Sequence, residues 1–233
     1  FSMSPQNAYD VRCTFVNQDT APPPAGSLTV TKTLNGAGQF NLTATAGGTT
    51  LGSASNVGNG GTFTVASITA GTSVTVAETA GTGTNLANYS SVLTCSGGGV
   101  SVQGTTSGTF TMPTGAAVTC GFTNTRLTNT VVVKKALSPT TDGGHFDLLL
   151  NGAVVKAAAG HGDASSAVTV AVGDSITVSE NPNADYTSSL TCTGAAGLPT
   201  NATGTTGNFT MPNAPVECTF TNTRKTNTLT VNK

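Results

Sequence analysis

The sequence predicts an all-β protein made of tandem Ig-like β-sandwich domains arranged as a rod. Threonine makes up roughly a fifth of the 233 residues, and both threonine and valine favour strands. The chain also contains 29 glycines and 10 prolines, which form turns and interrupt helices. One strand motif recurs at intervals of about one hundred residues, the size of a single sandwich domain. We therefore expect little helix and a repeated sandwich.

The low charge of the chain excludes several classes of partner. Charged residues make up 8% of the sequence, tryptophan is absent, and the formal net charge is -1. Proteins that bind nucleic acid or anionic membrane surfaces carry clustered basic residues instead. No uninterrupted apolar run is long enough to cross a bilayer. We predict no nucleic-acid partner and no membrane insertion of this segment.

The recurring strand alternates with period two. It runs from Val118 to Asn124, again from Val216 to Asn222, and a third time from Val11 to Asn17. In each copy valine, cysteine, phenylalanine and asparagine share one face. Too little sequence precedes the first copy to make a domain, so we expect that copy to close a preceding repeat.

The repeat divides the chain into five parts. A proline-rich stretch, expected to be extended and fairly stiff, separates the first copy from the rest. Two complete repeats follow, joined by the short segment 126–129, which leaves the neighbours little freedom. The predicted parts are 1–18, the C-terminal strands of a preceding repeat; 19–27, the proline-rich linker; 28–126 and 130–224, the complete β-sandwich repeats; and 228–233, the first strand of a following repeat.

Both complete repeats show the same strands in the same order. In the first, a strand from Leu28 to Lys32 is followed by one around Phe40. Glycine-rich turns then separate short segments up to Glu78, and a strand from Tyr89 to Cys95 precedes the recurring strand. In the second repeat the inward-facing residues of these strands are Val131, Val133 and Lys135; Phe146, Leu148 and Leu150; Ile176, Val178 and Glu180; and Tyr186, Leu190 and Cys192.

The five cysteines follow the repeat. Cys95 and Cys120 belong to one copy, Cys192 and Cys218 to the next, and Cys13 is left with a partner outside the chain. Evenly spaced cysteine pairs in a lysine-poor chain indicate disulfides and an oxidising compartment, so we predict an extracellular or cell-surface location. The alternative is that the cysteines are small buried hydrophobic residues with free thiols.

Three polar residues in each repeat are in phase with the buried faces. They are Lys32, Glu78 and Asn124 in the first repeat and Lys135, Glu180 and Asn222 in the second. If the three side chains meet in the core, desolvation favours a neutral amine beside a protonated carboxylic acid. A neutral lysine is a nucleophile, the asparagine amide is an electrophile, and the acid can move protons between them. Release of ammonia would then leave an amide bond between the side chains.

These motifs resemble the Cna B-type, or SpaA-type, prealbumin-like domains of bacterial surface proteins and pilins. The resemblance implies that the first and last strands are adjacent and joined by an internal isopeptide bond. It pairs Lys32 with Asn124 and Lys135 with Asn222, with Glu78 and Glu180 as the catalytic acids. Asn17 and Lys233 would take part in bonds whose partners lie outside the sequence. Many such domains lack the paired cysteines, so disulfides could be the cross-links here and the three polar residues a hydrogen-bonded remnant.

The alternative for the polar residues is a surface position. Lysines at strand ends often extend to solvent, glutamates begin turns, and asparagines end strands.

His145 and His161 have no further histidine or cysteine at ligand spacing, so we predict no metal site and no cofactor. Neither histidine has a counterpart in the other repeat, which argues against a hydrolase.

The sequence therefore predicts a non-enzymatic structural segment of an extracellular fibre, stalk or adhesin, stabilised by disulfides and isopeptide bonds. Its expected partners are neighbouring repeats of the same longer chain or filament. The alternative is a ligand-binding adhesin module that recognises a glycan or a host protein through its loops. Those loops contain few aromatic or arginine residues of the kind that dominate binding surfaces.

Overall fold

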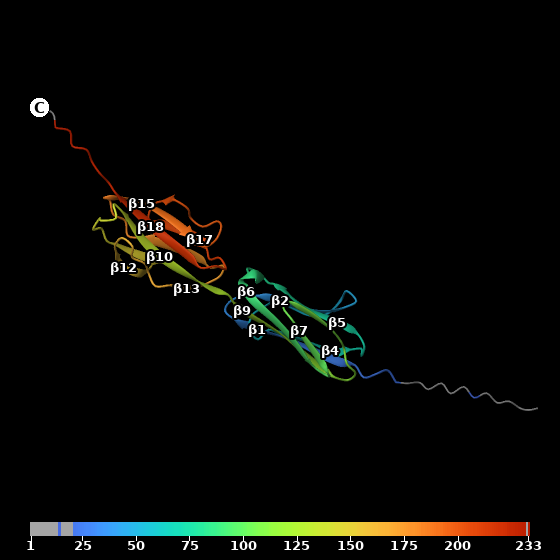
Figure 1. Ribbon diagram of the computed structural model, residues 1–233. Coiled ribbons are helices and arrows are strands. Elements are labelled where there is room, and N and C mark those ends of the chain that lie inside the picture. The colour runs from blue at the N-terminus through green and yellow to red at the C-terminus, as the bar shows by residue number, and fades with distance from the viewer. Residues whose placement is uncertain (1–13, 15–20, 232) are drawn as a thin grey trace, which may run out of the picture.

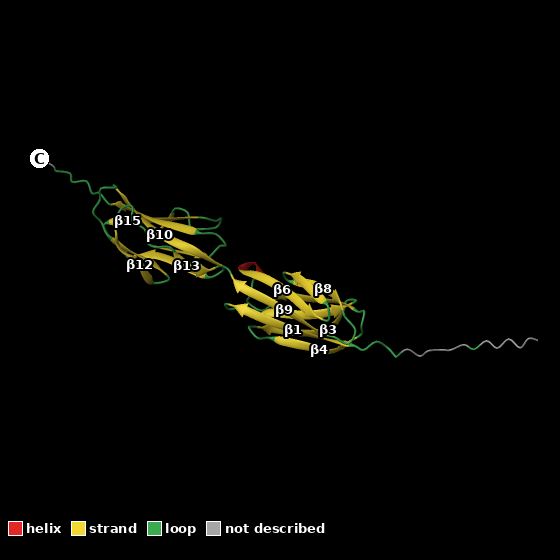
Figure 2. Ribbon diagram, turned by 60° about the horizontal axis from the view of Figure 1, so that its bottom comes forward, coloured by secondary structure: helices red, strands yellow, loops and turns green. Residues whose placement is uncertain are grey.

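The computed structural model shows two β-sandwich domains placed end to end (Figure 1), which confirms the predicted fold class. It describes residues 14, 21–231 and 233. The expected strand at 11–17, with Cys13 and Asn17, therefore lies outside the described residues apart from Thr14. Almost all regular structure is strand (Figure 2), and one short 3-10 helix, η1 (Leu86–Asn88), precedes β6. No helix in the described part of the chain is long and apolar enough to span a membrane.

The first domain packs a five-stranded sheet against a four-stranded one. The five-stranded sheet has the order β4-β1-β9-β6-β7, and the other has the order β3-β2-β5-β8. The strands are β1 (Gly26–Asn35), β2 (Phe40–Ala46), β3 (Thr49–Val57), β4 (Thr62–Ile68), β5 (Ser73–Ala80), β6 (Tyr89–Gly97), β7 (Val100–Gly104), β8 (Ser107–Thr111) and β9 (Ala117–Arg126).

The second domain repeats this arrangement. Its sheets have the orders β13-β10-β18-β15-β16 and β12-β11-β14-β17. The strands are β10 (Thr128–Ser138), β11 (Phe146–Leu150), β12 (Ala153–Ala159), β13 (Val168–Ala171), β14 (Ser175–Glu180), β15 (Tyr186–Thr193), β16 (Ala202–Thr203), β17 (Thr206–Thr210) and β18 (Val216–Arg224).

The first and last strands of each domain are neighbours and run parallel. β1 pairs with β9, and β10 pairs with β18, whereas the other paired strands are antiparallel. Because the two strands run in the same direction, the chain enters a domain at one end and leaves it at the other. This topology allows domains to follow one another in a line.

Strand alternation builds the two cores. Leu28 and Val30 of β1 point inward and are fully buried, while Thr29 and Thr31, which alternate with them, are only partly buried. The equivalent residues of β10, Val131 and Val133, behave in the same way. Threonine thus supplies strand propensity on the outer face, and aliphatic residues fill the interior.

A glycine is required where the cysteine-bearing strand turns. Gly97 ends β6 with a φ of 116°, and a Cβ there would lie 2.2 Å from the carbonyl oxygen of Ala117. Gly194 follows β15 with a φ of 122°, and its Cβ would lie 2.0 Å from the carbonyl oxygen of Pro215. Only glycine combines this backbone conformation with so close an approach.

The links between repeats differ from the expectation. β9 ends at Arg126 and β10 begins at Thr128, so a single residue, Leu127, joins the domains in place of the predicted segment 126–129. The described residues after β18 form no strand, and the first strand of a following repeat at 228–233 stays a prediction. A first strand pairs with the last strand of its own domain, and the described residues offer it no such partner.

Candidate functional site

Lysine and asparagine come from adjacent parallel strands, and glutamate comes from the opposite sheet. In the first domain Lys32 pairs in register with Phe122, so Asn124 lies two residues further along β9 on the same face. Glu78 lies on β5 of the other sheet and faces them across the core. The second domain places Lys135 and Asn222 in the same relation, with Glu180 at the end of β14.

All six side chains are buried. The lysines are 2% exposed, the glutamates 3%, and Asn124 and Asn222 are 0% and 1% exposed. The alternative in which lysine extends to solvent from a strand end is therefore wrong. Each strand continues past its lysine for several residues, which keeps the amine inside the sandwich.

The first domain holds an incompletely bonded group. Lys32 Nζ lies 2.9 Å from Glu78 Oε1, donates to the carbonyl of Thr33 over 3.3 Å and sits 4.2 Å from the centre of the Phe40 ring. The contact with Glu78 is not aligned as a hydrogen bond. Among the described residues, neither oxygen of Glu78 nor either polar side-chain atom of Asn124 has a hydrogen-bond partner. Such unsatisfied buried groups each cost roughly 1–3 kcal/mol.

In the second domain the group is bonded through a serine. Lys135 Nζ contacts Glu180 Oε2 and lies 3.9 Å from the centre of the Phe146 ring. Ser188 Oγ contacts Glu180 Oε1 and also donates to Asn222 Oδ1 over 3.2 Å. The serine hydroxyl therefore links the acid to the carbonyl group that an amine would attack.

Burial changes the protonation of the lysines. Desolvation lowers the pKa of Lys32 below its usual value of 10.5, against the opposing effect of the nearby carboxylate of Glu78. The pKa of Lys135 is lowered for the same reason, against the effects of Glu180. A lower lysine pKa increases the fraction of the neutral, nucleophilic amine at a given pH.

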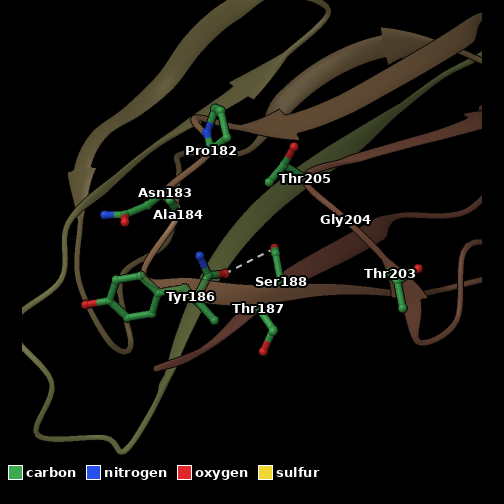
Figure 3. A pocket seen from close by; sticks show the side chains of 10 residues that line it. Pro182, Asn183, Ala184, Tyr186, Thr187, Ser188, Thr203, Gly204 and Thr205 are labelled. Atoms are coloured by element: carbon green, nitrogen blue, oxygen red, sulfur yellow. Dashed lines mark hydrogen bonds between the residues drawn. The ribbon is translucent and has the colours of Figure 1, made fainter. Parts of the chain in front are cut away.

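A pocket opens to solvent beside the group in the second domain. Segments 182–188 and 203–205 border it, and Asn222 forms part of its wall. In Figure 3 the dashed line from Ser188 marks its hydrogen bond to Asn222. Asn222 is thus almost fully buried and yet lines a pocket that opens to solvent.

A disulfide lies in the same sheet as each lysine–asparagine pair. Cys95 of β6 is bonded to Cys120 of β9, and Cys192 of β15 is bonded to Cys218 of β18. The bonded residues face each other across antiparallel strands. The last strand of each domain therefore carries both a disulfide and the asparagine.

Two features of the site were not identified from the sequence. The serines at positions 91 and 188 face the same interior as Tyr89 and Tyr186, and their phase with these tyrosines was a usable signal. The rings of Phe40 and Phe146 lie against the amines. An aromatic ring facing a buried lysine depends on how the two sheets pack, which the pattern along one strand does not show.

The remaining candidate residues take no part in this group. His161 Nδ1 accepts a hydrogen bond from Leu137, and His145 contacts the carbonyl of Ala158. The described residues contain no cluster of three or more histidine, cysteine or acidic side chains suited to a metal ion. Lys233 is exposed.

Comparison with known proteins assigns the family. Profiles described as prealbumin-like fold domains, of the SpaA type, match residues 27–126 and 133–224. The chain belongs to the SpaA-type prealbumin-like family. The resemblance predicted from the sequence is thereby confirmed, and the SpaA-type domains of this chain stand in tandem.

Solved structures with a similar arrangement include bacterial surface proteins. The major pilin of Streptococcus pyogenes is 17% identical, with a TM-score of 0.46, over 86% of this chain and 99% of the pilin chain. An adhesin from Mobiluncus mulieris, described as containing disulfide, isopeptide and ester cross-links, is 12% identical with a TM-score of 0.35, over 80% of this chain and 84% of that chain. No curated protein sequence matches this SpaA-type chain.

Proposed function

We propose that this SpaA-type chain is a structural segment of an extracellular fibre, stalk or adhesin, and that each complete domain closes itself with a lysine–asparagine amide bond. The observation that carries the proposal is the buried lysine, glutamate and asparagine, assembled twice in the same geometry. The only chemistry of the chain would be this single reaction on itself.

The proposed reaction uses the buried amine, acid and amide, of which the amine and the acid already lie in contact. The neutral Nζ of Lys32 attacks Cγ of Asn124, while the acid of Glu78 protonates the amide oxygen and later the departing nitrogen. The Cγ–Nδ2 bond breaks and ammonia leaves. The carboxylate takes back one proton from the lysine nitrogen and one from the amide oxygen as the carbonyl re-forms, so Glu78 ends as the acid it began as. The product is a neutral amide, so no ionisable amine remains buried and fewer buried N–H groups need a partner.

The second domain suggests a positioning role for its serine. A hydroxyl has one proton, so when Ser188 donates to Asn222 Oδ1 it can accept from the protonated form of Glu180. Proton donation from the acid would then reach the carbonyl through the hydroxyl. The pocket beside Asn222 offers ammonia a short route to solvent.

The disulfides support an extracellular setting, because such bonds persist in oxidising compartments. Parallel first and last strands support a fibre or stalk, because each domain passes the chain from one end to the other. These features fit neighbouring repeats as the main partners.

Intact mass under reducing conditions tests the chemistry. We expect the mass to fall below that of the sequence by one ammonia for each of the two complete domains. Peptide mapping should recover one branched peptide joining Lys32 to Asn124 and another joining Lys135 to Asn222. The unmodified mass would refute the amide bonds, and the mass of a deamidated chain would show hydrolysis instead.

A further inference from the structure

The contact between the two domains is centred on Arg126, the last residue of β9. Its Nε donates to the carbonyl oxygen of Val172 over 2.9 Å, and its Nη2 lies 3.1 Å from Asp174 Oδ1. The backbone N–H of Val172 in turn donates to the carbonyl of Leu127 over 2.9 Å. One arginine and its neighbour thus bind the loop that precedes β14 through three contacts.

The first domain fixes the direction of this arginine. Nη1 of Arg126 donates to the hydroxyl of Tyr89 over 2.9 Å, and the guanidinium lies 5.1 Å from the centre of the tyrosine ring. The tyrosine hydroxyl contacts the carbonyl of Ala37. A guanidinium is planar, so binding of Nη1 by the first domain aims Nε and Nη2 at the second.

The loop of the second domain that Arg126 contacts also allows a close approach of the first domain. Gly173 lies between the two bonded residues of the loop, and a Cβ at this position would come within 2.1 Å of Asn88 Nδ2. The equivalent residue of the first domain, Gly71, precedes β5 and would meet nothing within 4 Å. A close approach therefore occurs at the loop of the second domain and not at its counterpart.

Arg224 repeats the arrangement at the far end of the second domain. Its Nη1 donates to the hydroxyl of Tyr186 over 2.7 Å, and the guanidinium again lies 5.1 Å from the ring centre. Nη1 is also 3.6 Å from Asp142. Within the described residues, no hydrogen bond involves Nε or Nη2 of Arg224. The side chain is 47% exposed, against 21% for Arg126.

The backbone that follows Arg224 has the same hydrogen bonding as the backbone that follows Arg126. Lys225 follows it as Leu127 follows Arg126, and the N–H of Lys225 donates to the carbonyl of Asp185 over 2.8 Å. The N–H of Leu127 makes the equivalent bond to Asn88. Both residues are therefore held so that their own carbonyl can receive a further N–H.

The sequence indicates which partner this surface fits. At the junction that the structure describes, Arg126 stands two residues after Asn124 of β9, and the contacted loop contains Asp174. In the loop of the first domain Thr72 takes the place of Asp174. Asn17 is followed by Gln18 and Asp19, so arginine is missing before the domain whose loop lacks the acid. At the first of these two junctions arginine and aspartate are both present, and at the second both are missing.

We propose that the end of the second domain around Arg224 is a docking surface for another prealbumin-like domain, whose loop before the β14-equivalent strand presents a main-chain carbonyl followed two residues later by a carboxylate. The contact is the one that Arg126 makes with Val172 and Asp174. It sets the orientation of successive domains independently of any cross-link inside them.

Residual dipolar couplings on the full chain test the contact that Arg126 makes. With Arg126 in place, the couplings of both domains should fit one alignment tensor. Arg126→Ala should give each domain a different tensor and shorten the rotational correlation time of each. Arg224→Ala is the matched control, because it removes the equivalent tyrosine contact without touching the joint. A single tensor in Arg126→Ala, or an equal change in Arg224→Ala, would overturn the proposal.

A longer chain tests the docking surface itself. Residues 127–224 are repeated after Arg224, so that the added domain brings its own copies of Val172 and Asp174. The added domain should share the alignment tensor of the second domain. Both Arg224→Ala and Asp174→Thr in the added copy should release it, whereas Asp174→Asn should release it less, since it keeps an acceptor oxygen. Independent tumbling of the added domain with all these residues intact would refute the docking surface.

Discussion

The two domains contain the same three buried residues but bond them differently. In the second domain Ser188 connects Glu180 to Asn222, and a pocket reaches the edge of the site. In the first domain the serine is present as Ser91, paired in register with Asn124, yet the amide has no hydrogen-bond partner among the described residues. The contact between acid and amine is thus common to both sites, whereas the connection of the acid to the amide distinguishes them.

The largest expected effect comes from removing each acid separately. Glu78→Gln should abolish ammonia loss in the first domain only, and Glu180→Gln in the second only, as read by intact mass and branched-peptide mapping. A cross-link closing a loop of roughly ninety residues stabilises by about 4–5 kcal/mol in the chain-entropy account, so each variant should lower the unfolding free energy of its own domain by that order.

Lys134→Met is the matched control for this comparison. Lys134 neighbours Lys135 but points outward, where it pairs with Glu217. It should leave both ammonia losses unchanged. Retention of the cross-link in Glu78→Gln would show that the acid is not required in the first domain.

Removing a disulfide should have the next largest effect. Cys95 and Cys120 are 25 residues apart and Cys192 and Cys218 are 26 apart, so each bond should contribute roughly 3 kcal/mol. Replacing one pair by serine should lower the denaturation midpoint of that domain alone, measured by urea unfolding. If the ammonia loss disappears together with the disulfide, the two cross-links depend on each other.

The pH dependence of stability should reveal the buried amines when they are not cross-linked. In Asn124→Ala/Asn222→Ala, the folded lysines have a pKa below 10.5 and the unfolded lysines titrate near 10.5. Between these values the unfolded chain binds more protons, so stability should rise with pH, by at most about 1.4 kcal/mol per pH unit for each lysine.

The cost of burying a charged lysine is fully present below the pKa of the lysine in the folded state, and it is relieved as the pH approaches 10.5. Urea unfolding at a series of alkaline pH values measures this rise. Lys32→Met and Lys135→Met, added in the same background, should flatten the profile. A profile that is flat before these changes would contradict a lowered pKa in the folded state.

The smallest effect is expected from replacing the serines. It tests directly whether a serine hydroxyl connects the acid to the amide in the second domain only. Ser188→Ala should slow cross-linking of the second domain, followed as ammonia loss against time in freshly synthesised chain, while Ser188→Thr should restore the hydroxyl and the rate. Ser91→Ala should change the first domain less, because Asn124 receives no bond from it. Equal slowing by both alanine variants would mean that the two sites work alike.

Strand alternation made much of this site predictable. Val131 and Val133, which are in phase with Lys135, determine which of two neighbouring lysines points inward, and the structure buries Lys135 while Lys134 is partly exposed. The repeat also predicted which cysteines pair, and the structure contains both of these disulfides. These predictions succeed because a period of two assigns a face to every residue of a strand.

Contacts between elements were not predictable in the same way. The reach of Arg126 into the neighbouring domain depends on a tyrosine that aims it and on a loop more than forty residues further along the chain. The loop between β10 and β11 also differs from its counterpart, since it supplies Asp142 to Tyr186 where the first domain uses the carbonyl of Ala37. Such contacts arise from packing, which strand patterns do not encode.

The position of the last strand has a consequence for resistance to proteases. β9 is joined by its disulfide to β6, so cleavage of the chain between Cys95 and Cys120 leaves both fragments attached. The proposed amide to Lys32 on the other neighbour would extend this protection to every peptide bond between residues 32 and 124. A domain cut once in an exposed loop would then stay one molecule even after reduction, and a fibre built from such units would not be severed by a single nick there.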